Sequence, residues 1–110
     1  MIPTQMLKGI LEGCILKIIS LKATYAYQIS NELMKYGFGK VSEGTIYPII
    51  LRFQKNGWVD SLLKTSDSGP PRKYYSLTAR GKQELDDFQT NWQMLNDAIS
   101  NLLKEKNDVT

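Results

Sequence analysis

Histidine is absent from this 110-residue chain, and cysteine occurs once, as Cys14. Histidine is the commonest general base and a frequent zinc ligand, so its absence removes most acid–base and metal sites. A single cysteine forms no disulfide within the chain, which fits a reducing compartment, and we expect it to be a buried structural thiol. With no paired-carboxylate site to replace histidine, we expect no enzymatic activity, no cofactor and no bound metal.

Long uninterrupted apolar runs are also missing from the chain. The most apolar part, residues 6–21, carries Lys8, Glu12 and Lys17, and so it does not predict a membrane span. The N-terminus lacks the charged region and apolar stretch of a signal peptide, so we expect a cytoplasmic protein. At this length, with 42% apolar residues, the chain fits one domain with a modest core.

Charge is spread unevenly along the chain. Residues 1–82 hold twelve Lys/Arg and five Asp/Glu, a net of +7, whereas residues 83–110 carry a net of −4. A basic body with an acidic C-terminal segment suggests an anionic partner for the body alone. The alternative is a solvated surface whose charge is uneven by chance.

Hydrophobic spacing and capping residues predict four helices and one hairpin. Thr24, Ser42 and Thr78 are suitable N-caps, and Gly9 and Gly13 leave a small-residue notch for another helix. The helices are expected at residues 6–21, 25–36, 43–55 and 79–104. The strands are expected at residues 58–64 and 73–77, joined by a polar loop over residues 65–71.

Three short helices followed by a hairpin is the winged helix-turn-helix arrangement. Its third helix enters the DNA major groove, and its hairpin lies along the backbone or minor groove. We therefore expect a mainly α fold with a small β-hairpin wing. Residues 1–78 are expected to form the DNA-binding domain, residues 79–104 a dimerisation helix of the same compact unit, and residues 105–110 a frayed tail.

The third helix is expected to turn a polar face outward when Ile46, Ile50 and Phe53 face the core. Its hydroxyls and one guanidinium suit phosphate contacts at a helix N-terminus and base edges beyond them, and a glycine lets DNA approach closely. The alternative is a polar exposed face with a capped start. The DNA-binding set predicted here comprises Lys40, Ser42, Gly44, Thr45, Tyr47, Pro48 and Arg52.

The tip of the hairpin ends in two prolines followed by Arg72 and Lys73. The prolines stiffen the approach to two adjacent cations, which suits the gripping of backbone phosphates. The alternative is a solvated turn that carries a basic pair by chance.

Taken together, these segments resemble the PadR family of bacterial transcription regulators over roughly residues 5 to 103. Gly57 and Gly81 stand at the expected places between and after the motifs. The matching segments are LKGILEG at 7–13, YAYQI at 25–29, SEGTIYP at 42–48 and GPPRKYYSLT at 69–78. Several motifs in this order make the resemblance specific.

The resemblance implies a dimeric winged-helix protein, usually a repressor, that binds an inverted repeat. It assigns Tyr25 to a phosphate contact, the hydroxyl-bearing residues 42–47 to the recognition helix, and residues 72–73 to the wing. Two departures stand out: Ala26 replaces a usual glycine, and Leu51 replaces a common basic residue.

The last helix carries apolar residues at alternating spacings of three and four, which is a heptad seam. A helix of this length extends far beyond a body of about 80 residues, so a second chain is the simplest cover. The alternative is a helix folded back on its own domain. The predicted dimer interface comprises Leu7, Ile10, Leu11, Leu85, Phe88, Trp92, Leu95, Ile99 and Leu102.

A second hypothesis concerns a small hydrophobic or aromatic effector. The resemblance implies that such compounds stack on aromatic side chains in the dimer interface. The candidate lining residues are Met6, Ile10, Phe88 and Trp92. The alternative is that these side chains form a closed interface core.

We therefore expect a sequence-specific DNA-binding regulator: a repressor that binds an inverted-repeat operator as a homodimer and that an effector relieves. The first alternative is a helical dimeric protein-interaction module whose basic face meets an acidic protein. The second alternative, a small enzyme, has no constellation of residues to support it.

Overall fold

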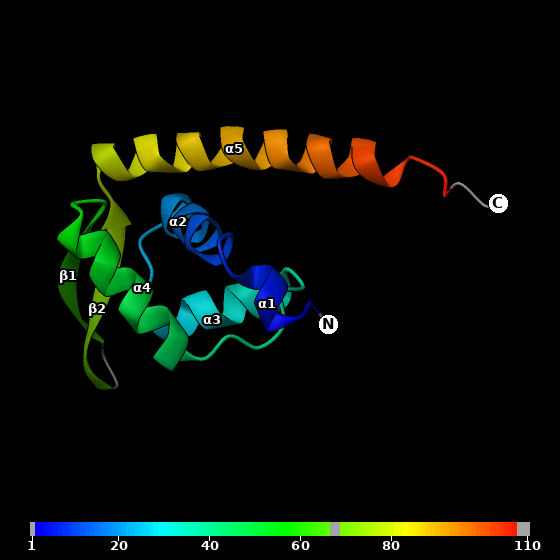
Figure 1. The fold of residues 1–110 in the computed structure, drawn as a ribbon. Coiled ribbons are helices and arrows are strands. Elements are labelled where there is room, and N and C mark those ends of the chain that lie inside the picture. The colour runs from blue at the N-terminus through cyan, green and yellow to red at the C-terminus, as the bar shows by residue number, and fades with distance from the viewer. Residues whose placement is uncertain (1, 67–68, 108–110) are drawn as a thin grey trace.

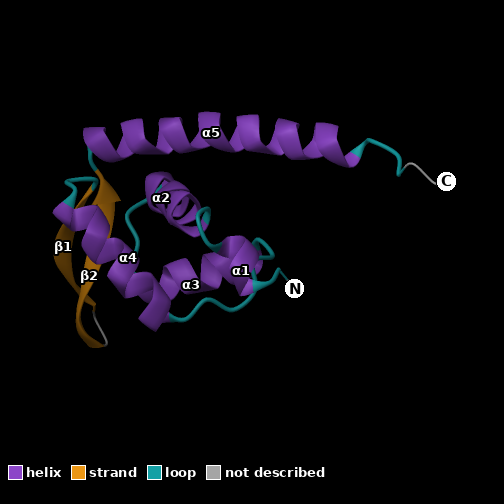
Figure 2. Cartoon of the chain, viewed as in Figure 1, coloured by secondary structure: helices purple, strands orange, loops and turns teal. Residues whose placement is uncertain are grey.

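The computed structural model describes residues 2–66 and 69–107. Within them, short helices and a hairpin form a body, and one long helix lies across it and continues past it (Figure 1). The elements are α1 (Thr4–Leu7), α2 (Leu11–Leu21), α3 (Ala26–Lys35), α4 (Glu43–Lys55), β1 (Val59–Ser66), β2 (Gly69–Leu77) and α5 (Ala79–Leu103). The predicted mainly α fold with a hairpin wing is confirmed (Figure 2).

The prediction of one continuous helix over residues 6–21 is wrong, because the helix is interrupted between α1 and α2. Gly9 has a φ of 89°, a left-handed conformation that no α-helix continues through. The expected notch is therefore formed by Gly13 alone. Gly13 is buried in α2, and a Cβ built on it would overlap the ring of Phe88 from α5.

Thr24 does not cap α3 as expected. Its backbone pairs with β2 instead: the Thr24 N–H donates to the Tyr75 carbonyl over 3.1 Å, and the Tyr75 N–H donates to the Thr24 carbonyl over 2.7 Å. The N-cap of α3 is therefore Tyr25, which makes no side-chain capping bond. The consequence is that the start of α3 is tied to the edge of the wing.

Capping of the third and last helices follows the expectation. The Thr45 N–H donates to Ser42 Oγ over 3.3 Å at the start of α4, and the Gly81 N–H donates to Thr78 Oγ1 over 3.1 Å at the start of α5. Thr78 Oγ1 also donates to the Gly57 carbonyl over 2.6 Å. This second bond joins the end of α4 to the beginning of α5.

The hairpin is longer than expected. Pairing runs from Val59 opposite Leu77 to Ser66 opposite Gly69, with an irregularity between Lys64 and Ser66. Most of the predicted loop over residues 65–71 is therefore strand, because prolines are tolerated on an edge strand where no ladder N–H is needed. Of that loop, residues 67–68 lie outside the described residues, as do residues 108–110 of the expected tail.

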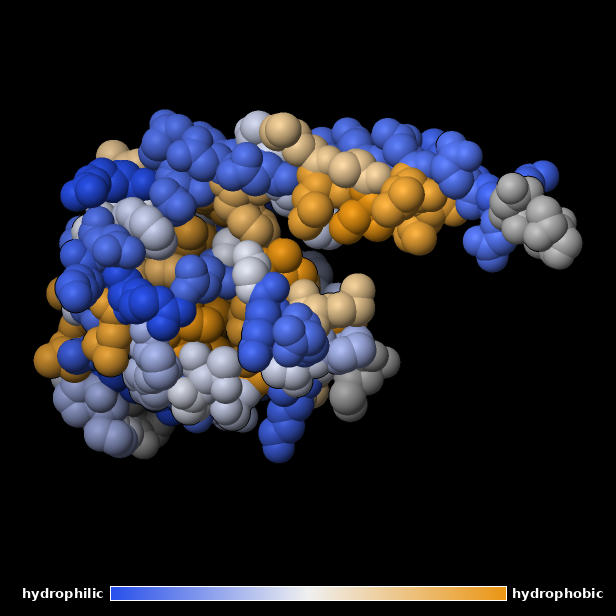
Figure 3. Space-filling model, viewed as in Figure 1, coloured by the Kyte–Doolittle hydropathy of each residue, from blue (hydrophilic) through white to orange (hydrophobic). Residues whose placement is uncertain are grey.

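The core lies where α2, α3, α4 and the hairpin meet. The expected inner stripe of α4 is confirmed, since Ile46, Ile49, Ile50 and Phe53 are all buried. The first turns of α5 join this core through the buried Gly81 and Leu85 and the partly buried Phe88. Farther along, Figure 3 shows apolar side chains on the side of α5 that faces the body, where they overhang open space. In the described residues, we find no helix with the length and apolar character of a membrane span.

Candidate nucleic-acid interface

The open face of α4 carries the side chains that the sequence predicts for DNA contact. Ser42 Oγ and Thr45 Oγ1 lie 3.2 Å apart at the N-terminus of the helix, and both residues are exposed. Tyr47 is 47% exposed on the same helix. The exposed neighbours of these residues are Lys40, Gly44 and Pro48. Hydroxyls beside unpaired helix N–H groups suit phosphate oxygens and base edges.

Arg52 is exposed on α4, but its guanidinium is paired with a carboxylate of α2. Its Nε donates to Glu12 Oε1 of α2 over 3.1 Å, and its terminal nitrogen forms an ion pair with the same oxygen. Both side chains stay partly exposed to solvent. Sequence spacing gave no signal for this pair, because the two residues are 40 positions apart. Arg52 therefore reaches an anionic ligand only by leaving Glu12.

The wing cations predicted from the sequence are both exposed, and the structure places Arg72 on an aromatic ring. Its guanidinium carbon lies 4.7 Å from the centroid of the Tyr25 ring. Lys64, which the sequence analysis missed, stands directly opposite Arg72 in the hairpin. The position of Lys64 beside Arg72 follows from the register of the two strands. The sequence did not predict this register, because it predicted a loop over residues 65–71 and a second strand that begins only at residue 73.

A hollow of about 510 Å³ lies between the wing and the start of α4. Tyr25 and Tyr47, both predicted for DNA contact, line it together with Arg72 and Lys73. Phenol hydroxyls and two cations around one hollow suit the phosphate backbone of a nucleic acid. Glu43 is the one carboxylate among its lining residues.

Tyr75 also borders this hollow, but its side chain belongs to the core. Burial raises the pKa of the Tyr75 phenol, and the nearby Tyr47 phenol raises it further. The Tyr75 hydroxyl is therefore a neutral structural group. The Cys14 thiol is comparable: it is half-buried, and burial raises its pKa, as expected for a structural cysteine.

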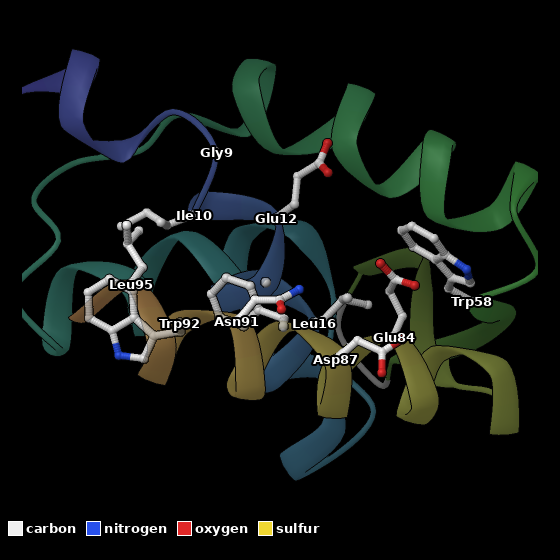
Figure 4. A pocket seen from close by; sticks show the side chains of 12 residues that line it. Gly9, Ile10, Glu12, Leu16, Trp58, Glu84, Asp87, Asn91, Trp92 and Leu95 are labelled. Carbon is white, nitrogen blue, oxygen red and sulfur yellow. The ribbon is translucent and has the colours of Figure 1, made fainter. Parts of the chain in front are cut away.

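A second hollow, of about 280 Å³, lies beneath α5. It contains Ile10, Phe88 and Trp92 from the predicted effector set, whereas Met6 lies outside it on the far side of the helix break. Figure 4 shows Trp92 at one end of the hollow and Trp58 at the other. The hollow is thus aromatic at both ends.

Three carboxylates border this second hollow, and its lining contains no lysine or arginine. They come from α2 and α5 and are Glu12, Glu84 and Asp87. An aromatic hollow with an acidic border is suited to a flat compound that carries positive charge.

The predicted dimer seam divides into two parts. Leu7 and Leu85 are buried within the single chain, at 7% exposure each, and Phe88 packs on Gly13. Ile10 and Leu11 are half-buried. For the first part of α5, the helix is therefore covered by its own body, which was the alternative to a second chain. The second part is open, with Trp92, Leu95, Ile99 and Leu102 between 42% and 72% exposed.

Comparisons with known proteins agree with this architecture. The model of the Transcriptional regulator PadR-like family matches residues 15–87. A crystal structure of a PadR-like transcriptional regulator from Bacillus cereus is similar, with 48% identity and a TM-score of 0.85, over 94% of this chain and 100% of that chain. A Streptococcus transcriptional regulator shares 36% identity with a TM-score of 0.82, over 93% of this chain and 100% of that chain.

A sequence relative is an uncharacterised protein from Lysinibacillus sphaericus, 28% identical over 101 residues, which cover 90% of this chain and 93% of that protein. The family model spans most of the winged-helix body and the beginning of α5. It includes α4 and the wing, which carry the candidate interface. The chain belongs to the PadR-like family of transcriptional regulators.

Proposed function

We propose that the protein is a transcriptional repressor that binds an inverted-repeat DNA operator as a homodimer. Family membership supports a DNA-binding regulator. The observation that carries the proposal is the hydroxyl-bearing face of α4 beside the cations of the wing, with a hollow of about 510 Å³ between them. The α4 face supplies groups for base edges, and the wing supplies charge for the flanking phosphates.

The open part of α5 supports the homodimer. The helix has 25 residues, which corresponds to a length of roughly 38 Å. Leu95, Ile99 and Leu102 are 48%, 45% and 72% exposed in the single chain. A second copy of the chain covers such a seam most simply, because the same heptad spacing is then present on both sides.

Repression would follow from geometry. Two copies of α4 related by a two-fold axis enter successive major grooves about 34 Å apart on one face of the DNA. The wings hold the flanking backbone, and the bound dimer excludes polymerase from the promoter. An activator would need a surface that recruits polymerase, so transcription assays with and without the operator separate the two.

The proposal is tested by selecting bound DNA from a random pool. We expect a palindromic consensus, and binding that weakens steeply between 50 and 200 mM salt, by about 10³-fold if six or more phosphates are contacted. A Thr45→Ala variant should change the preferred sequence, whereas an Arg72→Ala/Lys73→Ala variant should weaken binding to all sequences. Equal affinity for all sequences would instead favour the protein-interaction module with a basic face.

We also propose that a flat, hydrophobic effector binds in the hollow beneath α5 and relieves repression by changing the separation of the two DNA-binding heads. The aromatic ends of the hollow and its three carboxylates favour a cationic compound. Both tryptophans of the chain line this hollow, so their fluorescence reports on it directly. Titration should give a saturable change with planar aromatic cations, and a Trp92→Leu variant should lose most of it. No saturable change would favour a closed interface core.

A further inference from the structure

The wing carries a stack of cations and aromatic rings, which we name the cation–aromatic column. Its members, in order of contact, are Arg72, Tyr25, Tyr74 and Lys64. Arg72 Cζ lies 4.7 Å from the Tyr25 ring centroid, and the Tyr25 and Tyr74 rings meet edge-on with centroids 5.1 Å apart. Lys64 Nζ lies 4.8 Å from the Tyr74 centroid.

The strand register builds this column. Lys64 stands opposite Arg72, and Leu62 stands opposite Tyr74. Because side chains alternate between the two faces of a strand, Lys64, Arg72 and Tyr74 share one face of the wing. Tyr25 comes from outside the hairpin, beside the Thr24 backbone that pairs with β2. The column therefore ties both strands of the wing to the start of α3.

The column leaves both of its positive charges available. Lys64 and Arg72 are exposed, and within residues 2–66 and 69–107 neither of them pairs with a carboxylate. An aromatic face attracts a cation through its quadrupole without neutralising it. A phosphate can therefore bind a cation that lies on an aromatic ring without displacing a carboxylate. A cation in a salt bridge would first have to leave its carboxylate.

We propose that Lys64 is a third phosphate-binding cation of the wing and that Tyr74 positions Lys64 directly, and Arg72 through the Tyr25 ring, for this contact. The inference rests on the proposed DNA-binding function and deepens it. Long cationic side chains lose rotamer freedom when they bind, so holding them on rings beforehand reduces that loss. The ligand is the phosphodiester backbone beside the bases that α4 reads.

The charge of Lys64 is tested with the full chain and the selected operator duplex. Lys64→Gln removes the charge, and Lys106→Gln makes the same change three residues after α5, whose C-terminal end projects away from the wing (Figure 1). Fluorescence anisotropy between 50 and 200 mM salt gives the affinity and its salt slope. We expect Lys64→Gln to lower the slope by about 0.9 per protomer and to weaken binding about three- to tenfold, with no change for Lys106→Gln.

The positioning role of Tyr74 is tested by keeping or removing its ring. Tyr74→Phe keeps the ring and should bind like the unmodified protein. Tyr74→Leu should weaken binding about two- to fivefold and lower the salt slope. In a Lys64→Gln/Arg72→Ala background, Tyr74→Leu should have no further effect, because the cations that it positions are absent. Thermal melting of each variant establishes that it is folded.

The outcomes separate the two proposals. Equal binding by Lys64→Gln and Lys106→Gln, or by Tyr74→Leu and Tyr74→Phe, overturns the wing proposal while operator selection by the unmodified protein still supports the proposed function. An unmodified protein that selects no operator overturns the proposed function and the wing proposal with it.

Discussion

The ring of Phe88 on α5 lies directly over Gly13 of α2, where any Cβ would overlap it. Gly81, in the first turn of α5, is equally crowded, because a Cβ there would overlap the carbonyl oxygen of Trp58. Two glycines thus let α5 approach the body closely before its second half becomes exposed. Since the exposed half carries the proposed dimer seam, these two contacts set the direction in which α5 projects from the DNA-binding body.

Gly13→Ala is expected to destabilise the protein. Overpacking costs about 1–3 kcal/mol, and a Cβ at Gly13 would overlap three atoms of the partly buried Phe88 ring, which puts the cost near the upper end of that range. Alanine in a helix interior gains only about 1 kcal/mol over glycine, so the clash wins. We expect the free energy of unfolding, measured with urea, to fall by about 1–2 kcal/mol. Adding Phe88→Leu should recover part of the loss. A Gly13→Ala protein as stable as the unmodified one would contradict the packing described here.

Gly44→Ala should separate stability from DNA binding. A Cβ at Gly44 would contact only Ser42 Oγ, at 3.7 Å, so the fold accommodates it. We expect the free energy of unfolding to stay equal or to rise by up to about 1 kcal/mol, because alanine favours the helix. Affinity for the operator should fall about three- to tenfold, because the methyl group keeps the α4 backbone away from DNA. Unchanged affinity would remove Gly44 from the proposed interface.

The starts of α4 and α5 and the polar face of α4 could be predicted because their causes are local. Ser42 and Thr78 cap helices through residues three positions away, and the stripe of α4 follows from spacing alone. The interruption of the helix at Gly9 could not be predicted from local sequence in this way. A glycine inside a helix and a glycine in a left-handed break leave the same apolar spacing around them, and only packing of the rest of the body distinguishes the two.

The apolar seam of α5 shows a different limit of prediction from sequence. Its heptad spacing predicts that Leu85 and Ile99 are both covered, but spacing does not indicate which chain covers them. The structure buries Leu85 against its own body and leaves Ile99 45% exposed. The Arg52–Glu12 ion pair and the cation–aromatic column were likewise beyond sequence reasoning, because each depends on tertiary contacts between distant segments.

The two halves of the seam should respond differently to substitution. Ile99→Asp places a charge on the open part of α5, and we expect a folded monomer, seen as a halved mass in sedimentation and a loss of operator binding. Leu85→Ala removes a core side chain, so the free energy of unfolding should fall by about 2–5 kcal/mol. An Ile99→Asp protein that keeps the mass of a dimer would place the dimer interface elsewhere.

The Arg52–Glu12 pair should contribute little to stability, because both side chains are partly exposed. A double-mutant cycle with Arg52→Ala and Glu12→Ala should give a coupling free energy of less than about 1 kcal/mol, and a smaller one in 1 M salt. The measurement is urea unfolding of the four proteins at both salt concentrations. A coupling that is large and insensitive to salt would mean that the pair is shielded from solvent in the assembled protein.

Alkaline pH should weaken the fold through Cys14. Burial raises the pKa of this thiol above its ordinary value of 9.0, so the unfolded chain releases the proton first as pH rises. The unfolded state then binds fewer protons than the folded state, and the free energy of unfolding decreases with pH above about 9. Tyr75, raised in the same direction from 10.0, adds to the decrease at higher pH.

Cys14→Ala isolates the thiol, since alanine has nothing to titrate. Urea unfolding at pH 7.5 and at pH 9.5 should show a smaller loss of stability for Cys14→Ala than for the unmodified protein, with Tyr75 contributing little in this range. In parallel, the folded protein at pH 8 should react with iodoacetamide more slowly than the urea-unfolded chain, because the thiolate is the reactive form and folding suppresses it. Equal losses of stability together with equal rates would show that the folded environment of Cys14 does not disfavour its thiolate.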